Sequence, residues 1–405
     1  MSAISGSLGS LPNAVAALFP VELRDRLVAL RRELHAHPEL SNAEHETAAR
    51  LTAALVGLGA SDVRRIGATG LLARVPGRDR GAPVVAIRGD IDALPIHEET
   101  GLAFASTRPG VMHGCGHDVH ATWAVAAAAL LVRAPAEGDV IILLQPAEEL
   151  GDGALGMIRG GALDGVSAIF GAHVDRRFAV GQVVADTGPL AASADTFEII
   201  LRGTGAHAAR PHEGADPIVG AGALVLALQT IVSRRLNPAT AAVVTIGTLH
   251  AGAAPNVIPD RAVLGGTVRA IDAATRALIL GELSRIAEAT ATAYGLEARV
   301  AVNEGTPPVV NPPGPVAWAR QAATSLLGDP ALVPLGTLNM AAEDFAHYLE
   351  RVPGCFLRIG ACEAGGAMIP AHSPRFYAAE ESIFIGAAVL AETARVASRA
   401  LGQQR

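Results

Sequence analysis

The sequence predicts an α/β protein with a mixed, largely parallel sheet and helices on both faces, interrupted by a smaller α+β domain. Short apolar strands alternate with helical segments up to residue 188 and again after residue 306, which is typical of parallel sheets. The stretch between them has the order β-α-β-β-α-β, the split βαβ or ferredoxin-like plan. With 405 residues, the chain is long enough for two cores. We therefore assign residues 1–188 and 306–405 to one discontinuous domain and residues 189–305 to the inserted domain.

Composition excludes several classes of protein. Half of the residues are hydrophobic and 18% are charged, as in a folded chain, and the net charge of -7 argues against a nucleic-acid partner. Three cysteines cannot form an even disulfide framework, so a reducing, cytoplasmic location is expected. The start of the chain lacks the basic segment of a secretory signal, and the longest apolar run, Ala121–Val132, is too short to span a bilayer. We expect no membrane segment.

The first two predicted helices look structural. Leucines at helical spacing predict a helix over Val21–His37, which Pro38 ends. Ser41 and Glu44 then form a capping-box pattern for a second helix, which ends near Gly57.

Three apolar segments then predict strands: Val84–Ile87, Val140–Leu144 and Ser167–Phe170. Each is followed by ionisable residues: Asp90 and Asp92 after the first, Glu148 and Glu149 after the second, and His173 after the third. Open α/β sheets hold their ligands beyond the carboxyl ends of the strands. These side chains are therefore expected to converge.

The inserted domain accounts for the next six elements. Strands are expected at residues 196–201, 242–246, 262–268 and 298–302, and helices at 216–233 and 273–293. The proline-rich residues 305–315 predict a stiff, non-helical linker back to the first domain. A helix at 316–327, a strand at 355–359 and a final helix at 383–401 complete that domain.

The densest group of reactive side chains is the segment His113–His120, with the sequence HGCGHDVH. Thiolate and imidazole together suit Zn²⁺ and similar ions, although a glycine turn with hydrogen-bonded polar side chains would give the same pattern. The segment precedes a predicted buried helix, whose first N–H groups favour a thiolate at Cys115.

Glu148 and Glu149 follow a buried strand and a proline. An adjacent acidic pair is often only a solvated surface feature. Here, one carboxylate can bind a metal while the other moves a proton of a metal-bound water. His173 and His372 would add neutral nitrogen donors, enough with Cys115 for two metal ions.

The stretch Gly151–Gly156 matches the spacing of a dinucleotide-binding fingerprint. That motif requires a strand leading directly into the glycine turn, and the PAEE sequence intervenes here. A nucleotide-dependent oxidoreductase is therefore disfavoured.

Nine segments together resemble the M20 metallopeptidase family, and within it the amidohydrolase subgroup of hippurate, N-acyl-amino-acid and auxin-conjugate hydrolases. The segments occur in family order: Glu33–Ser41, Arg88–Pro95, His113–Asp118, Gln145–Glu149, His207–His212, Pro255–Pro259, Gly266–Arg269, Glu343–Phe345 and His372–Pro374.

The resemblance implies a zinc-exopeptidase-like fold and two divalent metal ions, with Zn or Mn expected and Co or Ni also compatible. The implied protein ligands are Cys115 as the bridge, with His117, Glu149, His173 and His372. Glu148 is implied as the general base for a metal-bridging water, and Asp92 as the residue that orients a ligand histidine. A turn-capping role for Asp92 remains open, and His113 and His120 are expected to support the site from outside the ligand set.

For the inserted domain, the resemblance implies a homodimer and a lid function. His207 would reach an active site, in its own subunit or in the partner subunit, and Asn256 and Arg269 would contact the substrate. An arginine fork suits a free carboxylate, although Arg269 could equally be an ordinary strand residue.

Three positions bear on the substrate. The family's His-x-Asp motif is Asp90-Ile91-Asp92 here, and its bridging aspartate is Cys115, as in the amidohydrolase subgroup. Ala206 stands where the subgroup commonly has glycine, which could narrow the pocket beside His207. We therefore expect hydrolysis of N-acyl amino acids, a small-molecule substrate. A dipeptidase or carboxypeptidase is the alternative, and a non-catalytic binding protein is disfavoured because the base and all the implied ligands are present.

Overall fold

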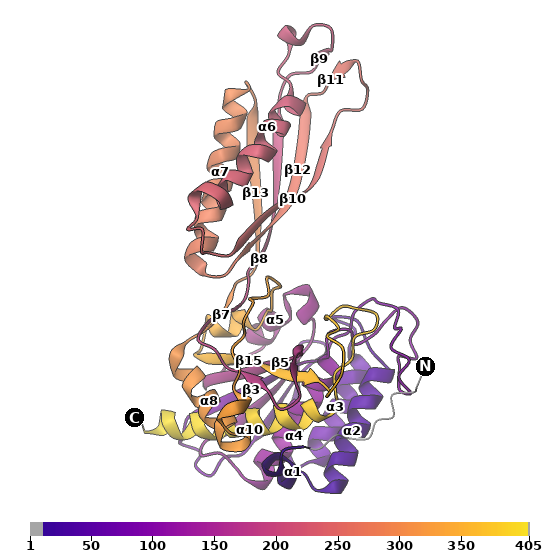
Figure 1. Cartoon of the computed structure of the whole chain (residues 1–405), viewed down its shortest axis with the longest axis vertical. Helices are drawn as coiled ribbons and strands as arrows, with labels where there is room; N and C mark the ends of the chain where they lie inside the picture. The colour runs from indigo at the N-terminus through magenta and orange to yellow at the C-terminus, as the bar shows by residue number, and fades with distance from the viewer. Residues whose placement is uncertain (1–10, 404–405) are drawn as a thin grey trace. The chain divides into compact units, whose positions relative to one another are not determined.

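We obtained a computed structural model of the chain, which describes residues 11–403 (Figure 1). The described chain divides into two compact units. The first comprises residues 11–188, 311–337 and 347–403, and the second comprises 189–310 and 338–346. Two short pieces predicted in the first domain thus belong to the second unit. Residues 306–310 do so because Thr306 continues a strand paired with Ala194, and residues 338–346 do so because the Ala341 carbonyl accepts a hydrogen bond from the Ala192 N–H.

The first unit is built on a seven-stranded sheet in the order β1-β2-β4-β3-β5-β15-β6. Its strands are β1 (Ser61–Ile66), β2 (Gly70–Val75), β3 (Val84–Asp90), β4 (Val140–Gln145), β5 (Val166–Ala179), β6 (Val183–Val184) and β15 (Gly354–Cys362). The four central strands, β4, β3, β5 and β15, are parallel, and the outer strands pair antiparallel. The predicted mixed, largely parallel α/β sheet is confirmed.

Helices and alternating apolar residues bury this sheet on both faces. The helices are α1 (Asn13–Leu18), α2 (Val21–Ala36), α3 (His45–Gly57), α4 (His117–Arg133), α5 (Gly153–Arg159), α8 (Pro313–Leu327) and α10 (Glu381–Gly402). Helices α4 and α10 pack together and against β3, in a core that includes Val85 and Ile87. The alternate residue Ala86 is equally buried, and α5 packs on β4 with Met157 also buried. A strand buried on both faces has no solvated side, which explains the continuous apolar runs in the sequence.

The second unit is a four-stranded sheet, β10-β12-β8-β13, with two helices that pack in its core (Figure 1). Its elements are β8 (Ala194–Arg202), β9 (Ala206–His207), α6 (Pro217–Thr230), β10 (Ala242–Ala251), β11 (Val257–Ile258), β12 (Arg261–Ala270), α7 (Ala273–Ala293) and β13 (Glu297–Thr306). Both helices begin at an aspartate cap, because Asp216 accepts from the Ile218 N–H and Asp272 from the Thr275 N–H, each at 2.8 Å. The predicted β-α-β-β-α-β order is present.

Short elements occur where the chain passes between the units: β7 (Gly188–Ala191), β14 (Val309–Asn311) and α9 (Ala346–Leu349). The proline-rich stretch predicted as a linker is therefore mostly regular structure. Its prolines lie at strand ends and at the first turn of α8, where a missing N–H is tolerated.

Two local predictions are wrong, and one pair of strands was missed. The capping box at Ser41 and Glu44 does not form, because neither side chain binds the first N–H groups of α3 and the Thr47 N–H is held by Glu39 instead. Strand β5 does not stop at Phe170, since pairing with β15 continues it to Ala179. The antiparallel pair β1 and β2 was not predicted, because β1 is mostly exposed and lacks an apolar run.

Among the residues that the structure describes, one helix is long and apolar enough to cross a membrane by length and composition alone, Pro217–Arg235. It consists of α6 and the π-helical turn Ile231–Arg235. Its buried side, which includes Leu224 and Leu228, packs in the core of the second unit.

We predict that Gly386→Ala lowers the free energy of unfolding by about 1–3 kcal/mol, as overpacking does in other cores. A Cβ at Gly386 would lie 2.3 Å from the ring of Trp123, which is fully buried and stacks on His120. Chemical denaturation measures the change. The control is Gly281→Ala in α7, where no described atom outside the neighbouring helix backbone lies within 4 Å of the added carbon, and we expect a gain of up to about 1 kcal/mol. Equal effects at the two positions would contradict the packing argument.

Candidate metal centre

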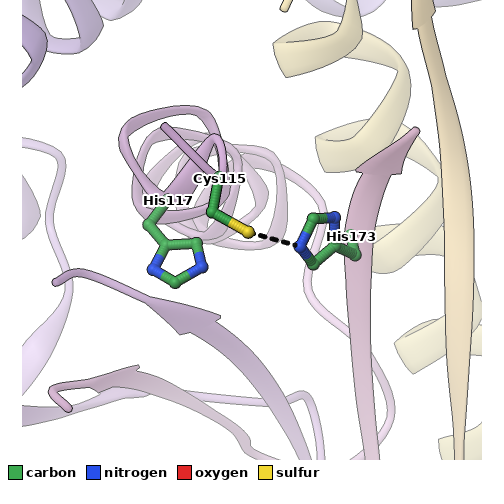
Figure 2. Close-up of side chains that lie close together, drawn as sticks. All are labelled: Cys115, His117 and His173. Atoms are coloured by element: carbon green, nitrogen blue, oxygen red, sulfur yellow. Dashed lines mark hydrogen bonds between the residues drawn. The ribbon is translucent and has the colours of Figure 1, made fainter. Parts of the chain in front are cut away.

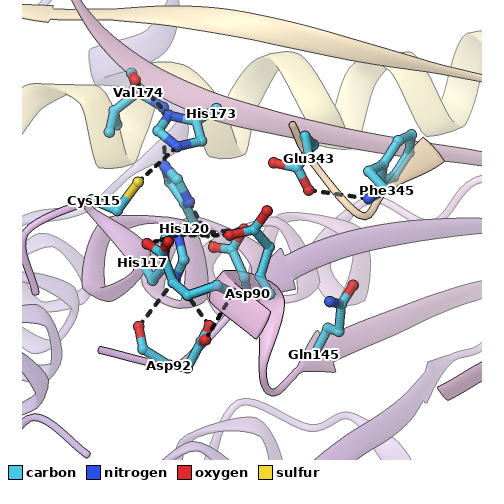
Figure 3. Close-up of polar contacts among 12 residues, drawn as sticks. Asp90, Asp92, Cys115, His117, His120, Gln145, His173, Val174, Glu343 and Phe345 are labelled. Carbon is cyan, nitrogen blue, oxygen red and sulfur yellow. Dashed lines mark hydrogen bonds and ion pairs between the residues drawn. The ribbon is translucent and has the colours of Figure 1, made fainter. Parts of the chain in front are cut away.

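His117 is the first residue of α4, directly after Gly116, whose φ of 88° is left-handed. The His117 Nδ1 lies 3.0 Å from both Oδ1 and the backbone oxygen of Asp92, so it donates to this residue (Figure 3). The buried Nε2 has no hydrogen-bond partner among the described residues. Burial lowers the pKa of His117, but the carboxylates of Asp90 and Asp92 outweigh it and raise the pKa well above its ordinary value. The surroundings of this nitrogen therefore favour a cation.

Cys115 and His173 face each other across the site, with 3.2 Å between Sγ and Nε2 (Figure 2). The His173 Nδ1 lies 2.6 Å from the Val174 carbonyl and donates to it, which leaves Nε2 with a lone pair. Burial, with Glu149 nearby, raises the pKa of the Cys115 thiol well above its ordinary value. Burial therefore opposes the thiolate that the N-terminus of α4 favours, and a bound cation would be needed to displace the proton.

Glu148 and Glu149 form a 3-10 turn, Glu148–Leu150, just beyond β4. Their side chains are 10% and 12% exposed, and a carboxylate oxygen of each lies 3.8 Å from the His117 Nε2. The backbone N–H of Glu149 donates to Oδ2 of Asp92 at 3.1 Å. The predicted pair is thus turned inward, toward the imidazole.

His372 comes from a loop near the end of the chain. Its φ of 67° is left-handed, and its N–H donates to the Gly114 carbonyl at 2.8 Å. Its Nε2 lies 3.4 Å from Oε1 of Glu149, a buried oxygen that makes no hydrogen bond within the described part of the chain. With a side chain 53% exposed, His372 lies at the open side of the site.

All five predicted ligand residues come together. Their donor atoms fall into overlapping groups within 4.8 Å: Cys115 with His117 and His173, Cys115 with Glu149 and His372, and His117 with Glu148 and Glu149. Unpaired imidazole nitrogen, thiol and carboxylate are the donors that zinc and related divalent ions take, and the unpaired buried atoms fit such an ion. These residues could hold a metal ion, with Glu148 adjacent.

Asp90 and His120 form a supporting pair whose contacts the sequence did not reveal. One Asp90 oxygen is 2.6 Å from Nδ1 of His120 (Figure 3). The other Asp90 oxygen is paired with Arg88. The His120 Nε2 in turn accepts the Val174 N–H at 2.9 Å, next to His173. Asp90 also groups with His117 and His120 within 4.8 Å, but each of its two oxygens already has a partner. The spacing of His120 from His117, one helical turn, was the available signal.

His113 is fully buried, and burial lowers its pKa to about 4. It is not in any of the donor groups found among residues 11–403.

The three predicted substrate contacts all lie in the second unit. His207 in β9 pairs with Val257 in β11, and the carbonyl of Asn256 accepts the Ala208 N–H at 3.1 Å. His207 and Asn256 thus lie together at an exposed two-stranded sheet, β9 and β11. Arg269 lies near the far end of β12, where its Nη1 donates to the Val268 carbonyl at 3.0 Å. The structure does not bring Arg269 to the other two.

We predict that Gly116→Ala lowers the metal content of the purified protein, because a Cβ there would lie 2.5 Å from Val174 on a left-handed backbone between Cys115 and His117. Gly114→Ala is the matched control, since its Cβ would make only ordinary contacts of 3.5 Å or more. Elemental analysis after dialysis measures bound metal per chain. Equal metal content in both variants would contradict this view of the turn.

Comparison with known proteins agrees with this geometry. Residues 86–396 match the model of peptidase family M20/M25/M40. An N-acetyl-L-cysteine deacetylase of Bacillus subtilis is 43% identical over 344 residues, which cover 84% of this chain and 81% of the relative. The IAA-amino acid hydrolase ILR1-like 4 of Arabidopsis thaliana is 35% identical over 402 residues, which cover 97% of this chain and 91% of the relative.

A solved structure is also similar. It is a Bacillus subtilis protein described as a dinuclear metal binding peptidase of the M20 family, with a TM-score of 0.82, 36% identity and coverage of 93% of this chain and 98% of that chain. On the sequence match, the relatives and the fold, the chain belongs to peptidase family M20/M25/M40.

Proposed function

We propose that this protein is a metal-dependent amidohydrolase that cleaves the amide bond of N-acyl amino acids. The observation that carries the proposal is the position of Glu148, which is inward-facing and adjacent to a set of converging metal donors. The names of the two relatives support the substrate class, since each describes hydrolysis of an amino acid that carries an added group.

The proposed ligands of two divalent ions are Cys115, His117, Glu149, His173 and His372. When bound, such ions would polarise the amide carbonyl and stabilise the developing negative charge. Thiolate and imidazole favour Zn²⁺, Co²⁺ or Ni²⁺ by softness, while the carboxylates also suit Mn²⁺, and elemental analysis decides among them.

Glu148 is the proposed general base. It takes a proton from the attacking water and returns it to the departing amine, which needs a carboxylate close to the ligands but not among them. Asp92 holds the Nδ1 hydrogen of His117 and so keeps Nε2 directed to the ligand set.

We further propose that the second unit contributes substrate contacts and the dimer interface, as the resemblance implied for residues 189–305. Arg269 lies eight positions after Arg261 in β12, about 26 Å along the strand, and the two-stranded sheet with His207 and the adjacent Asn256 lies beyond Arg261. One small substrate cannot touch both ends. If Arg269 and His207 both contact substrate, they do so in different sites, one of them in the partner subunit.

The surface for that dimer would lie on α6 and the edge strand β10. Ile218, Val219 and Leu226 of α6 are 45%, 54% and 73% exposed, and β10 has one paired side only. Ile218 and Leu226 lie eight residues apart, on one face of the helix. An unpaired edge beside an apolar helix suits a second copy, which would bring an identical edge and helix.

A reducing, cytoplasmic compartment fits the chemistry of the site. All three cysteines are free, and one of them is the proposed bridging ligand, which an oxidising environment would endanger.

We predict that the protein hydrolyses acetyl, benzoyl or indoleacetyl amino acids faster than dipeptides. Glu148→Gln should lower kcat about 10²- to 10⁴-fold with metal content unchanged, because the amide cannot accept the proton. Leu150→Ala, at an exposed neighbour, is the control and should retain activity. A chain that binds no metal, or a Glu148→Gln variant as fast as the parent, would refute the mechanism. A dipeptide preference would instead support the dipeptidase alternative.

We predict that the parent protein has twice the chain mass in solution and that Leu226→Glu shifts it to monomer, because the substitution buries a charge in the proposed interface. Light scattering coupled to size exclusion measures the mass. Val56→Glu in α3, an apolar position of the first unit that is 59% exposed, should leave the dimer intact. A dimeric Leu226→Glu variant would argue against this surface.

A further inference from the structure

The turn between α2 and α3, residues 40–44, lies directly beside the loop that follows β3. Its own bend is closed by a 2.9 Å hydrogen bond from the Ala43 N–H to the Leu40 carbonyl. Leu40 also forms a parallel bridge with Ala93, whose N–H donates to the Glu39 carbonyl at 2.9 Å. The backbone of the turn is therefore fixed next to Asp92.

The Ser41 hydroxyl hydrogen-bonds to a residue of the site instead of capping helix α3. Its Oγ donates to Oδ2 of Asp92 at 2.7 Å, and the same oxygen accepts the Glu149 N–H. The other oxygen of Asp92 accepts from His117. The Ser41 hydroxyl thus helps to set the plane of the carboxylate that orients His117 and holds the Glu149 backbone.

Glu44, three residues on, reaches the loop that carries the proposed base. Its carboxylate is fully buried, and it makes no cap to its own helix α3. One oxygen accepts the Ala147 N–H at 3.0 Å, and the other accepts the Thr69 hydroxyl at 2.8 Å. A carboxylate buried at this depth requires such partners, so the contacts are a strong constraint on the loop.

Ala147 is the residue that this contact holds. Its φ of 53° is left-handed, a conformation that residues with a Cβ avoid. It is tied on both sides, because its N–H donates to Glu44 and its carbonyl accepts the Gly153 N–H at 3.2 Å. Glu148 and Glu149 follow at once, so their direction depends on the bend at Ala147.

We infer that the turn at residues 40–44 is a positioning element of the site. In this turn, Ser41 orients Asp92, and Glu44 holds Ala147 so that Glu148 and Glu149 face His117. The inference rests on the proposed function, which assigns these residues to the reaction. Ser41 and Glu44 touch neither substrate nor metal and act through the residues they hold.

The first test is Glu44→Leu against Glu44→Gln. Leucine removes the acceptor for Ala147, so metal affinity and kcat should each fall about 10- to 100-fold while KM changes little. Glutamine keeps a carbonyl oxygen for the Ala147 N–H and should restore most of both. Metal affinity is measured by chelator competition with Zn²⁺ or Mn²⁺, and kcat on metal-loaded protein shown to be folded by circular dichroism.

Thr69→Val is the matched control, because it removes the other hydrogen bond of Glu44 and leaves the Ala147 contact in place. Its melting temperature should fall while metal affinity and kcat per folded molecule stay near those of the parent. Equal losses in Thr69→Val and Glu44→Leu, or a folded Glu44→Leu variant with the parent's metal affinity and kcat, would overturn the inference.

A double substitution tests the mechanism of positioning. Glycine adopts a left-handed φ without strain, so Glu44→Leu should lose less kcat in the Ala147→Gly background than in the parent. An equal loss in both backgrounds would overturn the role assigned to Ala147. If Glu44→Leu does not fold, Ser41→Ala decides the question: about a tenfold loss of metal affinity supports the positioning turn, and an unchanged affinity overturns it.

These outcomes are distinct from failure of the proposed function. A parent protein that binds metal but hydrolyses no N-acyl amino acid would refute the function, and the metal affinities of the variants would still decide on the positioning turn.

Discussion

The site depends on one buried carboxylate, Asp92, which is 1% exposed. Three segments far apart in the sequence donate to it: the Ser41 hydroxyl, the His117 ring and the Glu149 N–H. Burial raises the pKa of Asp92, but these hydrogen bonds, led by that of His117, outweigh it and lower the pKa. A buried charge is tolerated only while its partners stay in place, so the three segments are held to one another.

Asp90, two residues earlier, is a second buried carboxylate that holds side chains on the other side of the site. Its partners are Arg88 and His120, and the other ring nitrogen of His120 accepts the N–H of Val174, the residue after His173. The two aspartates therefore differ in the imidazole they orient: Asp92 contacts His117, and Asp90 contacts His120, which bonds to the residue after His173. Both aspartates of the Asp-Ile-Asp sequence thus hydrogen-bond to a histidine of α4.

Three loop residues at the site, Gly116, Ala147 and His372, have a left-handed backbone. Gly116 turns the chain into α4, and Ala147 and His372 adopt left-handed backbones without being glycine. Such residues persist where the surroundings over-determine them, and they cluster at functional sites. Here, the Ala147 N–H donates to the Glu44 carboxylate, and the His372 N–H donates to the Gly114 carbonyl.

The sequence by itself determined the alternation of strands and helices, the split βαβ order of the inserted segment and the chemical types of the proposed ligands. These features depend on patterns within a few residues or on motifs kept in order, such as His113–Asp118. Only the tertiary structure decided which partners the polar side chains take. Ser41 and Glu44 match a local capping box, yet in the fold Ser41 hydrogen-bonds to Asp92 and Glu44 to the Ala147 N–H. Likewise, pairing with β15 extends β5 past His173. Local propensities depend on residues within about one helical turn. Buried polar groups instead hydrogen-bond to the donors and acceptors that folding brings next to them, and those partners lie far away in the sequence.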